Sequence, residues 1–163
     1  MLTKWYYEIL RGSLSGSEIV VKDSNGGTQT ATAYYANYQA TTNFQTCNQL
    51  FKCMENIASG LNGYVLFGTN SSDVSETDYK ITTVSNVTIS KTTVQDGLTK
   101  TATYTIVNNN TTEITITEVG IYGSFKYNSN TVTYVLMERT LLDEPVTIPA
   151  SGVGQVVYTL TVS

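Results

Sequence analysis

The sequence predicts a mainly β protein, an antiparallel β-sandwich of about seven or eight strands. Charged residues make up only 13% of the chain, and threonine, asparagine and serine replace them on its polar faces. Because β-branched threonine suits a pleated surface and asparagine suits turns, this composition favours strands over helices. Short runs of alternating apolar and polar residues recur over residues 61–163, which is typical of two packed sheets. We therefore expect a sandwich domain there, with residues 1–60 packed on it.

The N-terminal segment is predicted to hold a helix and a hairpin. Apolar residues at the spacing of an amphipathic helix are followed by Gly12, which is expected to end it; they are Leu2, Trp5, Tyr6, Ile9 and Leu10. Trp5–Leu10 could also be extended, because aromatic residues favour strands as well. Two short strand candidates, Glu18–Lys22 and Thr28–Tyr35, flank a turn signal at residues 23–27.

A second helix is predicted over Phe44–Ala58, packed on the sheet. One apolar stripe marks it, made of Cys47, Leu50, Phe51, Met54, Ile57 and Ala58, and Gly60 stands where a C-terminal cap belongs. On such a helix the Cα atoms of Cys47 and Cys53 are roughly 9 Å apart, too far for a disulfide bond. Without histidine in the chain, a zinc site is not expected either. Both cysteines are interpreted as ordinary thiols, and no cofactor or metal is predicted.

The strands of the sandwich follow one another from Tyr64 onward. They are Tyr64–Phe67, then Val87–Val94 and Leu98–Val107 as a hairpin around Gln95–Gly97, then Thr111–Tyr127, Thr131–Arg139 and Gln155–Val162. Before the last strand, two prolines exclude residues 145–152 from the centre of a sheet. That segment is therefore predicted to be an edge strand or a corner.

The strand within residues 111–127 is predicted to be central and kinked. Ile114 and Ile116 alternate with polar residues, whereas Val119 and Ile121 alternate out of phase with them. One extra residue near Thr117–Glu118 would return all four side chains to one face, which is the effect of a β-bulge.

Several function classes are disfavoured by composition. The nine basic residues are scattered in a chain of net charge −4, so direct binding of nucleic acid is not expected. No run reaches the roughly 18 apolar residues of a membrane span, and no signal peptide is recognised, so we expect synthesis in a cytosol. Without histidine, a serine or cysteine nucleophile lacks its usual base. Adjacent carboxylates such as Asp143 and Glu144 are interpreted as a solvated turn, and no enzymatic activity is predicted.

A series of segments resembles a family of tailed-bacteriophage virion proteins, those described as tail, head-fibre or minor structural proteins. The segments are Tyr-Val-Leu-Phe-Gly-Thr at 64–69, Asp-Tyr at 78–79, Ile-Thr-Glu-Val-Gly-Ile-Tyr-Gly at 116–123, Leu-Met-Glu-Arg at 136–139 and the corner at 145–152. The resemblance covers about residues 60–163. It implies a non-enzymatic structural role in the virion, on the capsid, neck or tail, with other virion proteins as partners.

Two sets of side chains are candidates for that role. Glu118 and Arg139 could form a carboxylate–guanidinium pair that fixes the register at the bulge; alternatively both are solvated and contribute roughly 0–1 kcal/mol. Trp5, Tyr6 and Tyr7 head the segment outside the resemblance and are predicted to dock the protein on its neighbours.

The tyrosines leave two functions open. Tyr34, Tyr35, Tyr38, Tyr64, Tyr79, Tyr122, Tyr127 and Tyr134 stand among asparagine and threonine. Rings that face another subunit would indicate a homo-oligomer or a decoration subunit. An exposed row of rings would instead indicate a module that binds a carbohydrate or a host receptor, because rigid aromatic and adaptable polar groups suit recognition.

Overall fold

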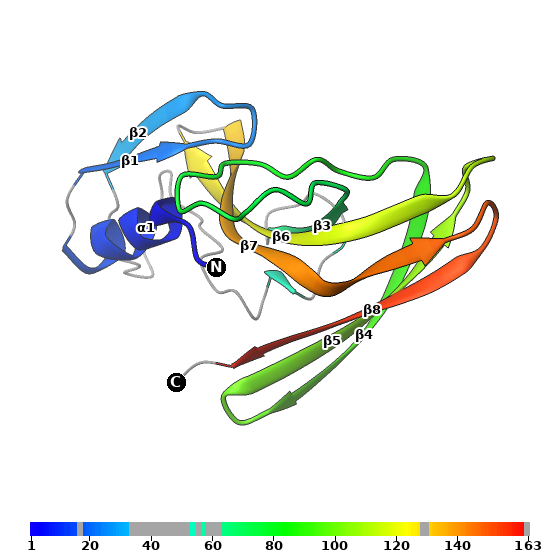
Figure 1. Ribbon diagram of the computed structural model, residues 1–163. Coiled ribbons are helices and arrows are strands. Elements are labelled where there is room, and N and C mark those ends of the chain that lie inside the picture. The colour runs from blue at the N-terminus through cyan, green and yellow to red at the C-terminus, as the bar shows by residue number, and fades with distance from the viewer. Residues whose placement is uncertain (16–17, 33–52, 55–56, 58–62, 128–130, 162–163) are drawn as a thin grey trace.

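One helix and eight strands make up the described part of the chain (Figure 1). The computed structural model describes all residues except 16–17, 33–52, 55–56, 58–62, 128–130 and 162–163. The elements are α1 (Lys4–Ser15), β1 (Glu18–Lys22), β2 (Thr28–Thr32), β3 (Tyr64–Gly68), β4 (Val87–Asp96), β5 (Thr99–Asn108), β6 (Ile114–Tyr127), β7 (Thr131–Ile148) and β8 (Val153–Thr161).

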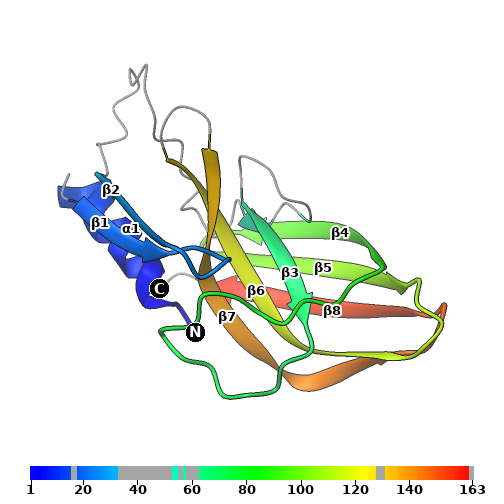
Figure 2. The ribbon, with the colours of Figure 1, turned by 90° about the horizontal axis from the view of Figure 1, so that it is seen from above.

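Two three-stranded antiparallel sheets form the sandwich, one ordered β3-β6-β7 and the other β4-β5-β8. Figures 1 and 2 show the first sheet lying across the second, with β7 on the side of β8. Alternate side chains of both sheets meet between them, with Tyr104 and Ile106 from β5 and Ile116 and Ile121 from β6 fully buried. The predicted antiparallel β-sandwich is confirmed.

The N-terminal segment packs against one end of the sandwich. The predicted hairpin forms from β1 and β2, and α1 lies against β1 and β7. The sequence predicted that the helix ends at Gly12, but in the structure it continues to Ser15. A glycine costs a helix only about 1 kcal/mol, and packing of the apolar face outweighs propensity of that size. The extended alternative for Trp5–Leu10 is therefore wrong.

The second predicted helix, over residues 44–58, lies outside the described residues except for Cys53, Met54 and Ile57. Cys53 and Met54 are fully buried in the main core. The Tyr104 hydroxyl donates a 2.9 Å hydrogen bond to the Met54 carbonyl. These two described residues of the predicted apolar stripe are therefore part of the core, and the partly buried Ile57 packs against it.

The irregularity predicted in β6 is present. Its register with β7 passes from Ile116 opposite Val146 to Glu118 opposite Leu141, and Ile116, Val119 and Ile121 all face the core. The slip is larger on β7, where residues 142–145 have no partner on β6. Pro145 lies in this unpaired stretch, which explains how β7 runs through a proline. Both alternatives predicted for residues 145–152 occur in turn: the edge strand β7 continues to Ile148, and residues 149–152 form a turn in which the Gly152 amide donates to the Pro149 carbonyl at 2.9 Å.

The outer edge of β7 pairs with the start of the chain. Leu2 forms an isolated antiparallel bridge with Glu138. The amide of Thr3 donates to the Met137 carbonyl at 2.9 Å, and the amide of Arg139 donates to the Met1 carbonyl at 3.1 Å. Residues 1–3 thus cover the middle of this edge, and no other segment of the described structure pairs with its C-terminal half.

Candidate functional site

A long loop, residues 69–83, covers the outer face of β6. Its ends meet at a bridge between Gly68 and Thr83, where the Thr69 amide donates to the Thr82 carbonyl at 2.9 Å. Beneath it Ile81 packs on Tyr122 and Leu136, and the Ile81 amide donates to the Tyr122 hydroxyl at 3.0 Å. The loop is therefore part of the packed structure.

Arg139 holds this loop to the sheet. Its Nε donates to Glu118 Oε2 at 2.6 Å, and one terminal nitrogen donates to Asp78 Oδ2 at 2.8 Å. The same nitrogen, Nη1, also donates to the Asp73 carbonyl at 3.1 Å, and Nη2 donates to the Ser72 carbonyl at 2.9 Å. The structure thus brings together Glu118 and Arg139, the two residues singled out in the sequence.

Both charges of the pair are buried, and each of their nitrogen and oxygen atoms has a hydrogen-bond partner. The side chains of Arg139 and Glu118 are 3% and 0% exposed. Glu118 Oε1 accepts hydrogen bonds from the amides of Asn70 at 3.1 Å and Thr82 at 2.9 Å. Burial alone would lower the pKa of Arg139, but hydrogen bonds and charges from Asp78 and Glu118 raise it. With each oxygen of Glu118 engaged, the cluster acts as a structural clamp.

The sequence analysis missed the loop side of this clamp. In the sequence Asp78 stands out only as part of the Asp-Tyr segment at 78–79, and backbone carbonyl groups are common to all residues, so the sequence does not single them out. Gly68 is a further part: a Cβ there would meet the Glu118 carboxylate and approach the Thr82 carbonyl oxygen to 2.7 Å. An apolar strand that ends in glycine before a polar loop closed by Asp-Tyr was the signal available for this arrangement.

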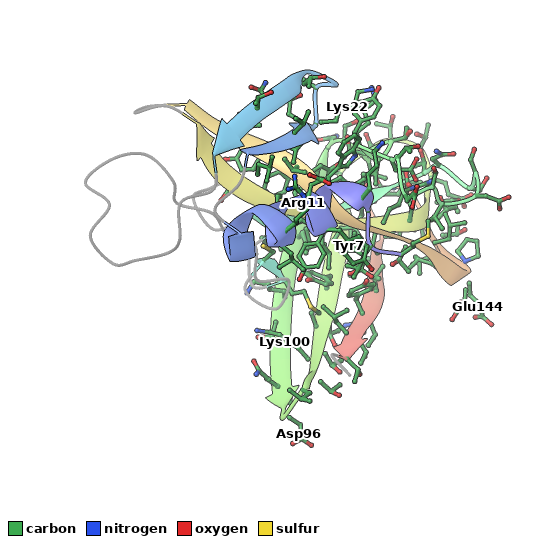
Figure 3. The ribbon with its side chains drawn as sticks, turned by 90° about the vertical axis from the view of Figure 1, so that its left-hand side faces the viewer. Tyr7, Arg11, Lys22, Asp96, Lys100 and Glu144 are labelled. Atoms are coloured by element: carbon green, nitrogen blue, oxygen red, sulfur yellow. The ribbon has the colours of Figure 1, made fainter. Side chains whose placement is uncertain are left out.

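The three N-terminal aromatic residues face different surroundings. Trp5 is half-buried against the cluster of Ile9, Ile19, Val21 and Val135, and its Nε1 donates to the Asp78 carbonyl at 3.0 Å. Tyr6 packs on the main core. Tyr7, labelled on α1 in Figure 3, is 56% exposed. Of the three predicted docking residues, Tyr7 is the one with most of its ring in solvent.

The described tyrosines of the candidate recognition set do not form an exposed row. Tyr64 stacks on Tyr122 with ring centroids 5.2 Å apart, and the ring of Tyr134 meets that of Tyr64 edge-on at 4.8 Å. Burial, and secondarily Tyr134, raises the pKa of Tyr64 to about 12. Tyr79 has the ammonium of Lys22 4.3 Å from its ring centroid. Tyr34, Tyr35 and Tyr38 lie outside the described residues, as does the side chain of Tyr127.

The outward surface of the sheet β4-β5-β8 is a different kind of feature. We call it the Thr/Val face. Its residues alternate with the buried ones along each strand, and they are Thr88, Ser90, Thr92, Val94, Asp96, Thr99, Thr101, Thr103, Thr105, Val107, Val153, Gln155, Val157, Thr159 and Thr161. Asp96 is its single charged residue, at the tip of the β4–β5 hairpin (Figure 3).

The Thr/Val face combines exposed apolar groups with hydroxyls that bond to each other. Val94 is 70% exposed, and Val153 and Val157 are 60% and 61% exposed. Across the strands the hydroxyl oxygens of Thr99 and Thr161, and those of Thr101 and Thr159, lie 3.0 Å apart. Polar groups already bonded within the sheet lose less when water is removed.

A groove of about 560 Å³ runs between β7 and β8. Leu142, Val146, Val156 and Tyr158 supply the apolar part of its mixed lining, and the exposed Asp143 and Glu144 stand on its β7 side. Figure 3 shows Glu144 projecting from the body of the molecule. Among the described residues, no strand pairs with the edge of β8 that faces away from β5.

Two kinds of site are missing from the described residues. They contain no cluster of three or more histidine, cysteine, aspartate or glutamate side chains able to hold a metal ion. No helix among them is long and apolar enough to span a lipid bilayer.

Comparison with protein-family models, with curated proteins and with solved structures gives no match for this chain. The resemblance of residues 60–163 to bacteriophage virion proteins therefore stays an expectation from sequence.

Proposed function

We propose that this chain is a non-enzymatic structural subunit of a bacteriophage virion, attached to the capsid, neck or tail. It works by burying surface against neighbouring virion proteins and copies of itself. The observation that carries this proposal is the Thr/Val face. The motifs of residues 64–152 that resemble tailed-phage structural proteins support its placement in a virion.

The Thr/Val face suits burial for reasons of charge. The chain has a net charge of −4, so its summed charge opposes association with a second copy or another acidic protein. On this face only Asp96 is charged, and charged residues are depleted at the core of protein interfaces. In the described parts of the chain, seven large hydrophobic side chains are exposed, and Val94, Leu98, Val153 and Val157 belong to this sheet and its hairpin turn. More than half of the exposed apolar side chains therefore lie on one sheet, which favours this sheet as an interaction surface.

The other candidate groups support a structural role. The carboxylate of Glu118 and the guanidinium of Arg139 are occupied within the fold. Tyr7 offers an exposed ring on α1, and we assign it a contact with a neighbouring protein at that end of the molecule. A carbohydrate- or receptor-binding module is the second candidate, and it requires the tyrosines that lie outside the described residues.

The test is incorporation into particles. Thr103 and Val157 lie opposite each other on the Thr/Val face, and a Thr103→Lys/Val157→Lys chain is supplied to host cells in which the encoding phage grows. Two buried charges should lower its amount in purified particles about tenfold or more, because uncompensated charges at an interface core are costly. The amount is read by quantitative mass spectrometry.

The matched control is Val20→Lys, on β1, where the valine is 45% exposed and lies off the Thr/Val face. It should be incorporated like the native chain. A native chain that is absent from particles, or a face variant that enters them normally, would overturn the proposal. Binding of a glycan by a monomeric native chain would favour the second candidate.

A further inference from the structure

We propose that copies of this chain assemble head to tail through the two edges of the sheet β4-β5-β8. The free edge of β4 in one copy lies beside the free edge of β8 in the next, along the groove below β7. The inference rests on the proposed function as an assembly subunit, and it names the partner, the surfaces and the symmetry.

Both edges are long and unpaired in the described structure. β4 has 10 residues and β8 has 9, and each pairs only with β5. Alternate residues of an edge strand leave N–H and C=O groups without a ladder partner, and such an edge is a template for another strand. Because both strands run antiparallel to β5, they run parallel to each other. A second copy in the same orientation, placed beside the first, therefore has its β4 parallel to the β8 of the first copy.

The charges at the two edges are complementary. Lys91, in the middle of β4, is the only basic residue of that strand. Its register opposite the buried Tyr104 puts it on the inward side of the sheet. The groove beside β8 carries Asp143 and Glu144 on β7, which lies on the inward side of β8. When the β4 strand of a second copy pairs with β8, its Lys91 therefore lies on the same side of the sheet as Asp143 and Glu144.

The same lysine disfavours the symmetric alternative. If two β4 edges paired around a twofold axis centred on the strand, the two copies of Lys91 would meet, and like charges opposite each other destabilise a sheet. A lysine in an edge strand is a usual protection against such pairing. The β4–β8 pairing replaces this repulsion with attraction.

Head-to-tail pairing has a consequence for symmetry. An interface with two different halves generates a closed ring or an open filament. It also joins the Thr/Val faces of successive copies into one continuous belt for other virion proteins. Neither free edge stays open in a ring.

The test is charge reversal of each half of the interface, read by sedimentation velocity of the purified chain. Lys91→Glu and Asp143→Lys/Glu144→Lys should each raise the dissociation constant of the oligomer roughly tenfold or more, and the triple variant should restore assembly because the charges are swapped. Lys80→Glu and Glu113→Lys, exposed and off both edges, are the controls and should assemble like the native chain. Melting temperatures establish that each variant is folded.

Each other outcome is decisive. The head-to-tail arrangement would be overturned, with the virion role left intact, if Asp143→Lys/Glu144→Lys assembled with the native dissociation constant. The same holds if the triple variant assembled no more tightly than Lys91→Glu or Asp143→Lys/Glu144→Lys. A native chain that enters particles but stays monomeric in solution at high concentration would also overturn it. Loss of incorporation in the Thr/Val face variant tests the proposed function separately.

Discussion

At the scale of single residues, Arg139 joins three parts of the chain that are distant in sequence. From β7 it binds Glu118 on β6 and the carbonyls and carboxylate of the loop over that strand. Removing two charges from water is costly, and their attraction offsets that cost only when the remaining donors and acceptors are satisfied. Here they are satisfied by loop backbone, so the ion pair and the loop conformation depend on each other.

We predict that Arg139→Met destabilises the protein by about 3–5 kcal/mol, because Glu118 is left buried without its counter-charge. Urea denaturation of the purified chain measures it. The control is Arg11→Met, whose ion pair with Glu8 is on the surface, and this variant should keep the native midpoint. Equal midpoints for Arg139→Met and the native chain would mean that the buried pair contributes nothing to stability.

At the scale of elements, the alternation of apolar and polar residues was enough to predict a strand where one of its faces is buried. The alternation in β5 and β8 and the phase slip in β6 follow directly from which side chains reach the core. The hairpin between β4 and β5 followed from Gly97, which adopts a φ of +55°. These features are local, so the sequence alone shows them.

Features that depend on a distant partner could not be predicted in this way. The continuation of β7 through Pro145 depends on residues 142–145 having no partner on β6. The conformation of residues 69–83 depends on the guanidinium of Arg139, which lies 61 residues after Asp78 in the chain. From the sequence, Glu118 and Arg139 could be either a buried pair or two solvated residues. The pair is buried because the loop over β6 excludes water from it, and the position of that loop cannot be predicted from local sequence.

For the loop element, we predict that Gly68→Ala destabilises the protein by about 1–3 kcal/mol, since the new methyl group would collide with Glu118 and the Thr82 carbonyl. Hydrogen exchange in residues 69–83 should become faster together with this loss. Gly97→Asn is the control, because nothing lies within 4 Å of a Cβ there and asparagine tolerates positive φ. Unchanged exchange in the loop would contradict the clamp.

At the scale of the whole molecule, tyrosine hydroxyls are spread through the core. Tyr64, Tyr104, Tyr122 and Tyr158 are buried, and burial raises the pKa of each, to about 12 for Tyr64. The unfolded chain ionises them near pH 10. Stability from these groups is therefore complete below pH 10 and is lost as pH rises from 10 towards 12 and above.

We predict cooperative alkaline unfolding in that window. Between pH 10 and its pKa in the folded state, each buried hydroxyl removes about 1.4 kcal/mol of stability per pH unit. Four of them together therefore reach the stability of an ordinary domain, about 5–15 kcal/mol, within a few pH units. Melting temperatures from pH 8 to 12 measure the loss. Tyr64→Phe should flatten the curve between pH 10 and 12, and Tyr7→Phe, at an exposed ring, should not. Equal curves for both variants would contradict burial of Tyr64.

The tip of the loop over β6 is anchored through main-chain atoms. Arg139 binds the carbonyls of Ser72 and Asp73, while the side chains of Ser71, Ser72 and Asp73 are exposed. Every amino acid offers the same backbone carbonyl, so these three positions can accept other side chains without loosening their anchor. The same property makes residues 71–73 a natural place to display a foreign epitope.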